Sequence, residues 1–525
     1  MSLARVYSRA NVGVAAPEVE VEVHVGNGLP KVSLVGLPQT AVRESKDRVK
    51  AALLNAGFEF PDGAVTISLA PADLPKEGSR FDLPIALGIL AASAQVDDRR
   101  FGEFEFIGEL SLSGQLKPVR GVLPMAIRAH AADRGLVAPV DNGAEAALAG
   151  GERVFCGGSL LAVVGWLHGR EDLPRAEAAP AVAEDRAPDL ADVQGQSVAR
   201  RALEVAAAGA HNLLMNGPPG TGKTMLASRL PGILPPMTRA EALDAAAVAS
   251  VSQAGLDLER WAVRSFRAPH HTASSAALVG GGSRPQPGEI SLAHHGVLFL
   301  DELPEFHRNV LEVLREPMES GRIVISRAAS FAEFPARFQL VAAMNPCPCG
   351  YHGDTSGRCR CTSEQVQRYR SRISGPLLDR IDLHVEVARP ARAVINGHGA
   401  TPENSAAVRE RVIAARALQL QRGGAPNAQL SDAQLRDACR LPAPLERFLE
   451  SVAEQMNLSP RACQRVLKVA RTLADLESSD AITQEHLAEA ISYREVDRTG
   501  PHRKWTDTID PNDWRTTKGA KTDAS

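Results

Sequence analysis

The stretch LLMNGPPGTGKTMLASRL, residues 213–230, decides the fold of the larger part of this 525-residue chain. A short apolar run leads into a glycine-rich turn and then into a helical pattern, which is the context that a phosphate-binding loop requires. Gly217, Gly220 and Gly222 are expected to take positive φ and to turn backbone N–H groups onto phosphates at the start of a helix. The sequence therefore predicts a nucleotide site here.

Two side chains of this loop carry chemistry. Lys223 is expected to place its charge near the β and γ phosphates, and Thr224 to offer a hydroxyl to Mg²⁺. A glycine-rich turn without a ligand is the alternative, and the strand-like and helical runs around the loop argue against it. The residues predicted to hold the nucleotide and its metal are Gly217, Pro218, Pro219, Gly220, Thr221, Gly222, Lys223, Thr224 and Asp301.

Two later apolar runs end in polar residues that would complete this site. GVLFLDE (296–302) ends in Asp301, placed to hold Mg²⁺, and Glu302, placed to orient and deprotonate the attacking water. FQLVAAMN ends in Asn345, at the sheet edge where ligands bind, and its amide can orient the same water. Asp-Glu as a solvated turn is the alternative. Together the motifs predict a nucleoside triphosphate hydrolase.

The chain divides into parts by composition and pattern. Residues 171–188 are rich in Ala, Pro and charge and are expected to form a linker. Residues 1–170 mix strand-like and helical runs and predict an α+β domain, whereas 189–395 alternate regularly and predict a parallel sheet covered by helices. Only helical patterns follow in 402–495, which predicts a small bundle. Residues 496–525 are polar, and we expect a disordered tail.

Composition excludes several classes of protein. A net charge of -3 means that any nucleic-acid contact must come from a local basic patch. The N-terminus lacks the apolar segment of a secretory signal, and no run approaches the roughly 18 to 20 apolar residues of a membrane span. We expect a cytoplasmic protein with no membrane partner, in which the seven cysteines stay reduced.

Four of these cysteines lie close together in MNPCPCGYHGDTSGRCRC, residues 344–361. One loop could bring four thiolates around a tetrahedral Zn²⁺, with His352 able to replace one of them. The C-x-C spacing is tighter than usual for zinc, so redox pairing and metal-free thiols stay open as alternatives. The candidate zinc ligands are Cys347, Cys349, Cys359 and Cys361.

The same segment continues into a basic stretch. With Tyr369 interleaved, its arginines could follow a nucleic-acid backbone by phosphate pairing and stacking. A solvated basic helix that faces a neighbouring subunit is the alternative. The arginines are Arg358, Arg360, Arg368, Arg370 and Arg372.

Over about residues 1–500 these motifs resemble AAA+ ATPases of the magnesium-chelatase-like group and, more narrowly, the YifB/ComM family of bacterial proteins. GPPGTGKT matches the family's Walker A segment, GVLFLDE its Walker B segment and AAMNPCPCG its sensor-1 segment. DVQGQ (192–196) resembles the segment that frames the adenine. The resemblance implies ATP and Mg²⁺ as cofactors and a homo-hexameric ring.

The resemblance also assigns two arginines. GPLLDRIDL resembles the segment with the arginine finger, at Arg380, which would complete the nucleotide site of the next subunit; LSPRACQRVLKVARTLADL resembles the sensor-2 helix, at Arg461. From the residues alone, Arg380 fits equally well a structural ion pair with Asp379 or Asp382. Both arginines and Glu302 and Asn345 are thus the candidate catalytic residues.

Two insertions support the subgroup, and the N-terminal domain adds a further likeness. Residues 267–296 resemble the helix-2 insert and 321–338 the hairpin before sensor 1, loops that touch the threaded substrate in related motors. Residues 1–170 resemble the Lon-protease fold, related to ribosomal protein S5 domain 2. Asp82 and Leu123 stand where Lon has its Ser–Lys dyad, which argues against peptidase chemistry. The nearby Ser79 and Lys76 are expected to be structural.

The family resemblance implies an ATP-driven hexameric DNA translocase or helicase that promotes branch migration in recombination during natural transformation. A magnesium-chelatase-type or chaperone-like remodeller of a protein partner is the alternative, because it would use the same ring. An ATP-dependent peptidase is the third possibility, and Asp82 and Leu123 argue against it.

Overall fold

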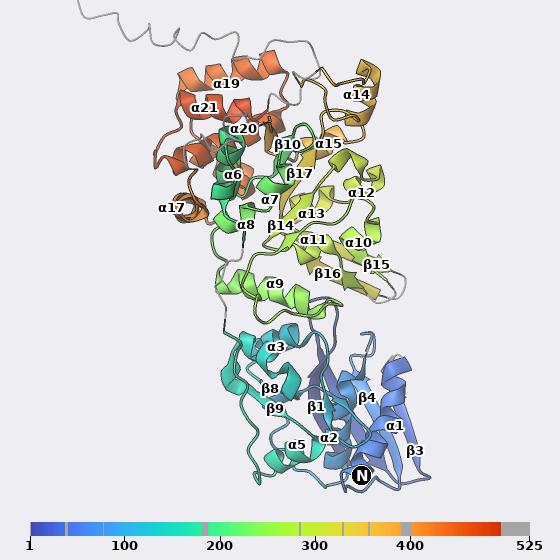
Figure 1. Cartoon of the computed structure of the whole chain (residues 1–525). Helices are drawn as coiled ribbons and strands as arrows, with labels where there is room; N and C mark the ends of the chain where they lie inside the picture. Colours follow the sequence, from blue (N-terminus) through green and yellow to red (C-terminus); the bar gives the residue numbers. More distant parts are fainter. Residues whose placement is uncertain are drawn as a thin grey trace, which may run out of the picture.

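The chain folds into three units that follow one another along the molecule (Figure 1). An N-terminal α/β unit lies at one end, a second α/β unit in the middle and a helical unit at the other end. The predicted tail, 496–525, lies outside the described residues. The residues that the computed structural model describes are 2–36, 40–76, 78–180, 187–282, 285–327, 330–354, 357–389 and 402–494.

The N-terminal unit is built on a mixed seven-stranded sheet in the order β3-β4-β2-β1-β5-β8-β9. In β2 three valines alternate with glutamates, and the valines are buried, as expected for a strand with one face on a core. The strands are β1 (Ser2–Arg9), β2 (Glu18–Gly26), β3 (Lys31–Val35), β4 (Ala64–Ala70), β5 (Phe104–Phe106), β8 (Gly135–Pro139) and β9 (Val154–Gly157), with a ribbon of β6 (Glu109–Leu110) and β7 (Leu116–Lys117). The helices are α1 (Thr40–Asn55), α2 (Asp82–Ala92), α3 (Val122–Ala131), α4 (Gly143–Ala146) and α5 (Leu160–Leu167).

Part of the predicted linker belongs to this unit. The backbone N–H of Cys156 in β9 donates to the carbonyl of Pro174 at 2.8 Å, and that of Ala176 donates to Val154 at 2.9 Å. Leu173 is buried in the N-terminal core. The start of the segment 171–188 therefore runs along the edge strand of the sheet.

The positions aligned with the Lon dyad hold structural residues. Asp82 begins α2, and its buried carboxylate accepts two hydrogen bonds from the Arg48 guanidinium, at 2.9 and 3.1 Å. Burial raises the pKa of Asp82, and Arg48 opposes that rise. Ser79 donates to Glu109, and Lys76 donates to the carbonyl of Pro71. The likeness of the whole unit to the Lon fold stays a prediction.

The central unit contains the predicted parallel sheet, with strand order β11-β14-β17-β10-β18. All its pairings are parallel, and its four long strands are almost wholly buried, as expected where helices cover both faces. The strands are β10 (Leu213–Asn216), β11 (Phe266–Arg267), β14 (Val297–Leu300), β17 (Gln339–Met344) and β18 (Leu383–Glu386). The helices are α6 (Ser197–Gly209), α7 (Lys223–Ala227), α8 (Leu230–Ile233), α9 (Arg239–Val251), α12 (Arg308–Glu312), α13 (Arg315–Ser320), α14 (Ser363–Arg370) and α15 (Gly375–Leu378).

Two insertions extend from this sheet. The first follows β11 and contains α10 (Ser275–Val279), the short strands β12 (Gly280–Gly281) and β13 (Gln286–Pro287), and α11 (Glu289–Leu292). The second is an antiparallel hairpin of β15 (Arg322–Arg327) and β16 (Ser330–Pro335), which confirms the two strands predicted before β17.

Helix α9 joins the N-terminal and central units, and Figure 1 shows it between them. Leu123 and Leu148 of the N-terminal unit form a buried cluster with Ala246 and Trp261. The hydroxyl of Ser250 in α9 donates to Glu145 at 2.5 Å across the same junction. Leu123 thus packs between units rather than lying in a peptidase site.

The C-terminal unit is purely helical within residues 402–494, as predicted, and packs on α6 of the central unit. Helices α17 and α20 both contact α6, and the start of α20 is capped by Ser459, whose hydroxyl accepts from the N–H of Ala462 at 3.1 Å. No helix among the described residues is long and apolar enough to cross a bilayer. The helices are α17 (Ser405–Gly423), α18 (Asp432–Ala438), α19 (Ala443–Met456), α20 (Pro460–Leu476) and α21 (Gln484–Ser492).

A buried carboxylate, Asp382, ties this helical unit to the sheet. It accepts from Nδ1 of His211 and from the N–H of Asn212, both at 3.2 Å, and from Arg465 of α20. His211 also contacts Thr472 of α20 at 2.8 Å. Burial acts to raise the pKa of Asp382, but the hydrogen bond from His211 and the charge of Arg465 outweigh it and hold that pKa well below its ordinary value.

We predict that Asp382→Asn lowers the free energy of unfolding by about 3 kcal/mol, because it leaves buried donors without their counter-charge. Urea unfolding of the full chain measures the loss. Since the folded pKa is depressed, the stabilisation is present above the unfolded pKa of about 4 and is lost as the pH falls below it. Asp437→Asn, in an exposed ion pair with Arg440, is the matched control and should leave the midpoint unchanged. Equal stability of both variants would contradict the role of Asp382.

Candidate nucleotide site and cysteine cluster

The predicted phosphate loop connects β10 to α7, as its pattern required. Gly220 and Gly222 have φ of 77° and 84°, which confirms the expectation of positive φ at these two positions. The same expectation is wrong for Gly217, which is absent from the positive-φ residues. Glycine is needed there for close approach, because a Cβ on Gly217 would lie 2.3 Å from the carbonyl oxygen of Val387.

Lys223 connects the loop to the neighbouring strand. Its buried Nζ donates to the carbonyls of Gly217 and Pro218, at 2.6 and 3.0 Å, and to Oδ1 of Asn345 at 3.1 Å. Burial lowers the pKa of Lys223, while the charges of Asp301 and Glu302 act to raise it. The structure thus brings together the lysine and the amide that were predicted from separate motifs.

The two predicted magnesium ligands also meet. The hydroxyl of Thr224 donates to Oδ2 of Asp301 at 2.6 Å, and Oδ1 of Asp301 accepts from the N–H of Glu302 at 2.9 Å. A hydroxyl and a carboxylate side by side are oxygen donors of the kind that Mg²⁺ takes in nucleotide sites. Thr224 and Asp301 are therefore the residues that would hold the ion, and its charge would neutralise the phosphates.

The segment predicted to frame the adenine lies against this loop. Nε2 of Gln196 donates to the carbonyl of Thr221 at 2.6 Å, and Asp192 pairs with Arg229, just beyond α7, at 3.0 Å. Arg461 lies at the start of α20 with its side chain exposed. Its role in nucleotide sensing stays a prediction.

The ion-pair partner of Arg380 is neither of the two aspartates, Asp379 and Asp382, that the sequence suggested. Its guanidinium is nearly buried and pairs with Glu319 of α13 at 2.5 Å, whereas Asp382 pairs with Arg465 and His211. Arg380 also donates to the carbonyl of Pro376 at 2.6 Å. To reach the nucleotide of a neighbouring subunit, Arg380 would have to exchange Glu319 for a phosphate.

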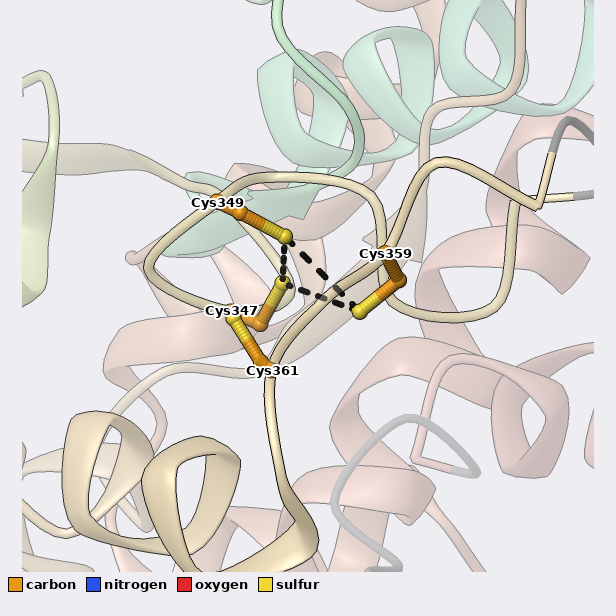
Figure 2. Close-up of side chains that lie close together, drawn as sticks. All are labelled: Cys347, Cys349, Cys359 and Cys361. Carbon is orange, nitrogen blue, oxygen red and sulfur yellow. Dashed lines mark hydrogen bonds between the residues drawn. The ribbon is translucent and has the colours of Figure 1, made fainter.

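The four candidate zinc ligands converge, as Figure 2 shows. Their ligand atoms all lie within 4.8 Å of one another, and Sγ of Cys347 is 3.3 Å from that of Cys349 and 3.9 Å from that of Cys359. Zinc–sulfur bonds of about 2.3 Å in a tetrahedron place the sulfurs about 3.8 Å apart. The ring of His352 is not part of this group; its backbone N–H donates to Sγ of Cys347 at 3.3 Å.

The cysteine loop favours a thiolate at Cys349, whereas the pKa values of Cys359 and Cys361 are raised, and the loop lies against the nucleotide site. Backbone N–H groups of Arg360 and Tyr351 lower the pKa of Cys349 to about 6. Gly350 has a φ of 83°, and a Cβ there would lie 2.6 Å from Cδ of Pro219 in the phosphate loop. The cysteine loop therefore touches the wall of the nucleotide site.

The predicted stacking role of Tyr369 is wrong. Its ring is buried in the core of the central unit, because Val366 and Tyr369 form the inner face of α14, and burial raises its pKa. Arg368 and Arg372 are exposed but pair with Glu364 at 2.8 Å and Glu305 at 2.9 Å. Arg358 and Arg360 are exposed on the cysteine loop itself.

One residue near the site was missed in the sequence. Nδ1 of His271 lies 3.1 Å from Oε2 of Glu302, at the end of β14. A signal existed, because His271 comes shortly after the run that becomes β11, and β11 pairs with β14. The run that becomes β11 has only two residues, so pattern alone did not mark it.

Comparisons with known proteins give matches along most of the chain. The family described as "Magnesium chelatase, subunit ChlI" matches residues 189–395, "Subunit ChlI of Mg-chelatase" matches 21–142, and "Magnesium chelatase, subunit ChlI C-terminal" matches 402–494. The chain is 52% identical over 503 residues to "Competence protein ComM" of Haemophilus influenzae, covering 95% of this chain and 98% of that protein. The chain belongs to the YifB/ComM family.

Other relatives agree with this membership. "Uncharacterized protein YifB" of Escherichia coli is 49% identical over 498 residues, 95% of this chain and 98% of that protein. "Magnesium-chelatase 38 kDa subunit" of Cereibacter sphaeroides is 26% identical over 328 residues, 58% of this chain and 90% of that protein. As a YifB/ComM protein with a magnesium-chelatase-like AAA+ unit, the chain belongs to a group that uses ATP and Mg²⁺ and is commonly oligomeric.

Proposed function

We propose that this YifB/ComM protein is an ATP-hydrolysing AAA+ motor, a ring of six copies, that moves along branched or single-stranded DNA. The observation that carries the ATPase part is the meeting of three strand ends: Lys223 touches Asn345, and Thr224 touches Asp301. Strand ends at one edge of a parallel sheet are where such folds bind ligands.

Each residue of the site has a separate role in the proposed hydrolysis of ATP. Lys223 and the loop N–H groups hold the phosphates, and Thr224 and Asp301 hold Mg²⁺. A water molecule gives its proton to Glu302 while its oxygen bonds to the γ-phosphorus and the bond to ADP breaks. Asn345 orients that water, and Arg380 of an adjoining copy stabilises the charge of the transition state.

Two observations support DNA as the substrate. The Haemophilus influenzae relative carries the name competence protein, which fits branch migration in recombination during natural transformation. The hairpin β15–β16 exposes Phe331 and Val324, and the cysteine loop exposes Arg358 and Arg360. An aromatic ring and guanidinium groups are the contacts that single strands take without sequence preference.

A protein remodeller is the second candidate. The three magnesium chelatase subunit families that match the chain favour it, because they point to a ring acting on a partner subunit. A peptidase is disfavoured, since Asp82 and Leu123 are buried at the positions of the Lon dyad.

DNA-dependent ATPase activity tests the proposal. We predict ATP hydrolysis that single-stranded or branched DNA stimulates and that salt weakens steeply, because phosphate contacts release counterions. Lys223→Ala should abolish nucleotide binding, and Glu302→Gln should keep binding but lower kcat by about 10²-fold or more. If DNA leaves the ATPase rate unchanged, remodelling of a protein partner becomes the favoured function. If no adenine nucleotide binds, the ATPase assignment is wrong.

Mixed oligomers test Arg380. We predict that Glu302→Gln and Arg380→Ala chains, each inactive alone, regain part of the activity when mixed, because some interfaces then combine an intact Glu302 with an intact Arg380. Steady-state ATPase rates across mixing ratios measure the recovery. Mixing Glu302→Gln with Lys223→Ala chains is the control and should restore nothing. No recovery in the first mixture would contradict a role in trans.

We also propose that the four cysteines hold Zn²⁺, which would brace the segment after Asn345. Purified protein should contain zinc in an equimolar amount, and Cys359→Ser should lose it and lower kcat several-fold through the contact of the loop with Pro219. Cys463→Ser, outside the cluster, is the matched control. Protein without zinc, whose cluster thiols become reactive only after a reductant is added, would favour redox pairing instead.

A further inference from the structure

A cavity of about 600 Å³ lies between the N-terminal unit and the hairpin β15–β16. Its walls come from both units, because Pro71 and Arg80 follow β4, whereas Phe331 and Phe334 belong to β16. Ligand sites in proteins have volumes of about 300 to 1,000 Å³, so the cavity is large enough for a ligand. None of its described lining residues belongs to the nucleotide site or to the cysteine cluster.

Close packing holds the two walls of this cavity together. The turn between β1 and β2 reaches the hairpin, and a Cβ on Gly13 of this turn would lie 2.7 Å from the carbonyl oxygen of Glu333 in β16. The next residue, Val14, packs against the core of the central unit. Figure 1 shows the hairpin facing the N-terminal unit. A backbone contact therefore sets the distance between the walls.

The N-terminal wall carries two arginines. Arg80 is nearly buried, and its Nη1 donates to the backbone carbonyl of Arg120 at 3.3 Å. Arg120 is exposed, and its guanidinium has no hydrogen-bond or ion-pair partner among the described residues. Asp73 is the one acidic side chain among the described lining residues, so positive charge is in excess. The wall therefore offers a free guanidinium to an anionic group.

An amide on the same wall lacks a partner. Nδ2 of Asn11 donates to the carbonyl of Arg120 at 3.1 Å, which helps to hold the backbone of this arginine. Oδ1 of Asn11 is buried and accepts from no donor among the described residues. A buried acceptor without a donor is unfavourable, and an N–H group of a ligand would satisfy it. The cavity thus also fits a hydrogen-bond donor.

The hairpin wall carries an aromatic ring. Phe331 is 58% exposed and lines the cavity, although large apolar side chains are usually covered. Three prolines of the N-terminal unit add apolar surface to the cavity: Pro17, Pro71 and Pro75. An aromatic face beside apolar walls favours a flat ring as the ligand group.

These features together match one nucleotide. A phosphate pairs with a guanidinium, a base stacks on an aromatic ring, and the edge of a base carries N–H donors for an amide oxygen. A simple anion would have no use for Phe331, and a purely apolar ligand would have none for Arg120. Stacking also requires an unpaired base with a free face, which a single strand offers.

We propose that the N-terminal unit forms half of a single-strand site, in which this cavity holds one nucleotide of the DNA. Its phosphate lies at Arg120, and its base stacks on Phe331. The inference rests on the proposed DNA motor and deepens it, because it assigns a contact with the strand to the N-terminal unit. Since Arg120 and Phe331 belong to different units, the bound strand joins the N-terminal unit to the hairpin.

The test is the affinity of the assembled full chain for single-stranded DNA, measured by fluorescence anisotropy of a labelled oligothymidylate. Arg120→Ala should weaken binding about fivefold and reduce the slope of log affinity against log salt by about 0.7, the contribution of one phosphate contact on a single strand. Arg120→Lys keeps the charge and should keep the slope. Arg170→Ala is the matched control, because Arg170 is an exposed arginine of the same unit outside the cavity, and it should bind like the unaltered protein.

Variants of Phe331 test the stacking. Phe331→Ala should weaken binding about tenfold, as the loss of one base stack does. Phe331→Leu is apolar but has no planar ring, so it should lose as much, whereas Phe331→Tyr should bind like the unaltered protein.

A double variant tests whether both side chains hold the same nucleotide. Arg120→Ala combined with Phe331→Ala should weaken binding about tenfold, because a nucleotide that has already left the cavity has no second contact to lose. Two independent contacts would instead multiply to a loss of about fiftyfold.

A free nucleotide carries the same chemical groups as a nucleotide of a strand, so a second measurement separates the two sources. Labelled thymidine monophosphate should not bind at the concentration at which the oligothymidylate saturates, because a strand is also held by contacts outside the cavity. Binding of the monophosphate at that concentration, lost in Arg120→Ala, would assign the cavity to a free nucleotide and overturn the inference.

The outcomes distinguish this inference from the proposed function. If the unaltered protein binds the oligothymidylate but Arg120→Ala binds as tightly as Arg170→Ala, or the double variant shows the product of the single losses, the inference alone is overturned. If the unaltered protein binds no single strand, the DNA part of the proposed function has failed and the inference falls with it. A loss confined to the cavity variants, no greater in the double variant than in Phe331→Ala, supports it.

Discussion

The pairing of β10 with β17 on one side and β18 on the other is the constraint on which the rest of the structure depends. Asn216, the last residue of β10, lies opposite Met344 and Glu386. The residues that follow must therefore leave the sheet side by side, and the N–H of Gly217 donates to the carbonyl of Met344 at 3.2 Å. Lys223 can reach Asn345 only because backbone pairing has already set both starting points.

The same sheet binds the helical unit through a buried charge. Asp382 precedes β18 and receives donors from the turn before β10 and from α20. Arg465, which pairs with it, also donates to the carbonyl of Arg380 at 3.3 Å and lies one turn after Arg461. The two arginines predicted to sense nucleotide, one in its own site and one in the neighbour's, are thus on elements joined by one ionic contact.

Sequence patterns predicted what depends on local periodicity and missed what depends on contacts between insertions. Apolar runs ending in Asp301 and Asn345 identified β14 and β17, because a buried strand has a simple pattern. The stacking role predicted for Tyr369 was wrong because the neighbouring arginines suggested an exposed stretch. Val366 and Tyr369 lie three residues apart and form the buried face of α14. No local pattern links Arg380 to Glu319, since that ion pair depends on how α13 meets the turn before β18.

Three separate segments contact the central sheet, two at the edge that carries the nucleotide site and one, α20, at the opposite edge. The cysteine loop follows Asn345 and touches Pro219; His271 brings the first insertion to Glu302; Asp382 brings α20 to the base of β18. Each contact is a polar pair or a close packing, small beside the cost of breaking the sheet. We therefore expect ATP binding to change these three contacts while the five strands keep their positions, so that three segments can move relative to one rigid sheet.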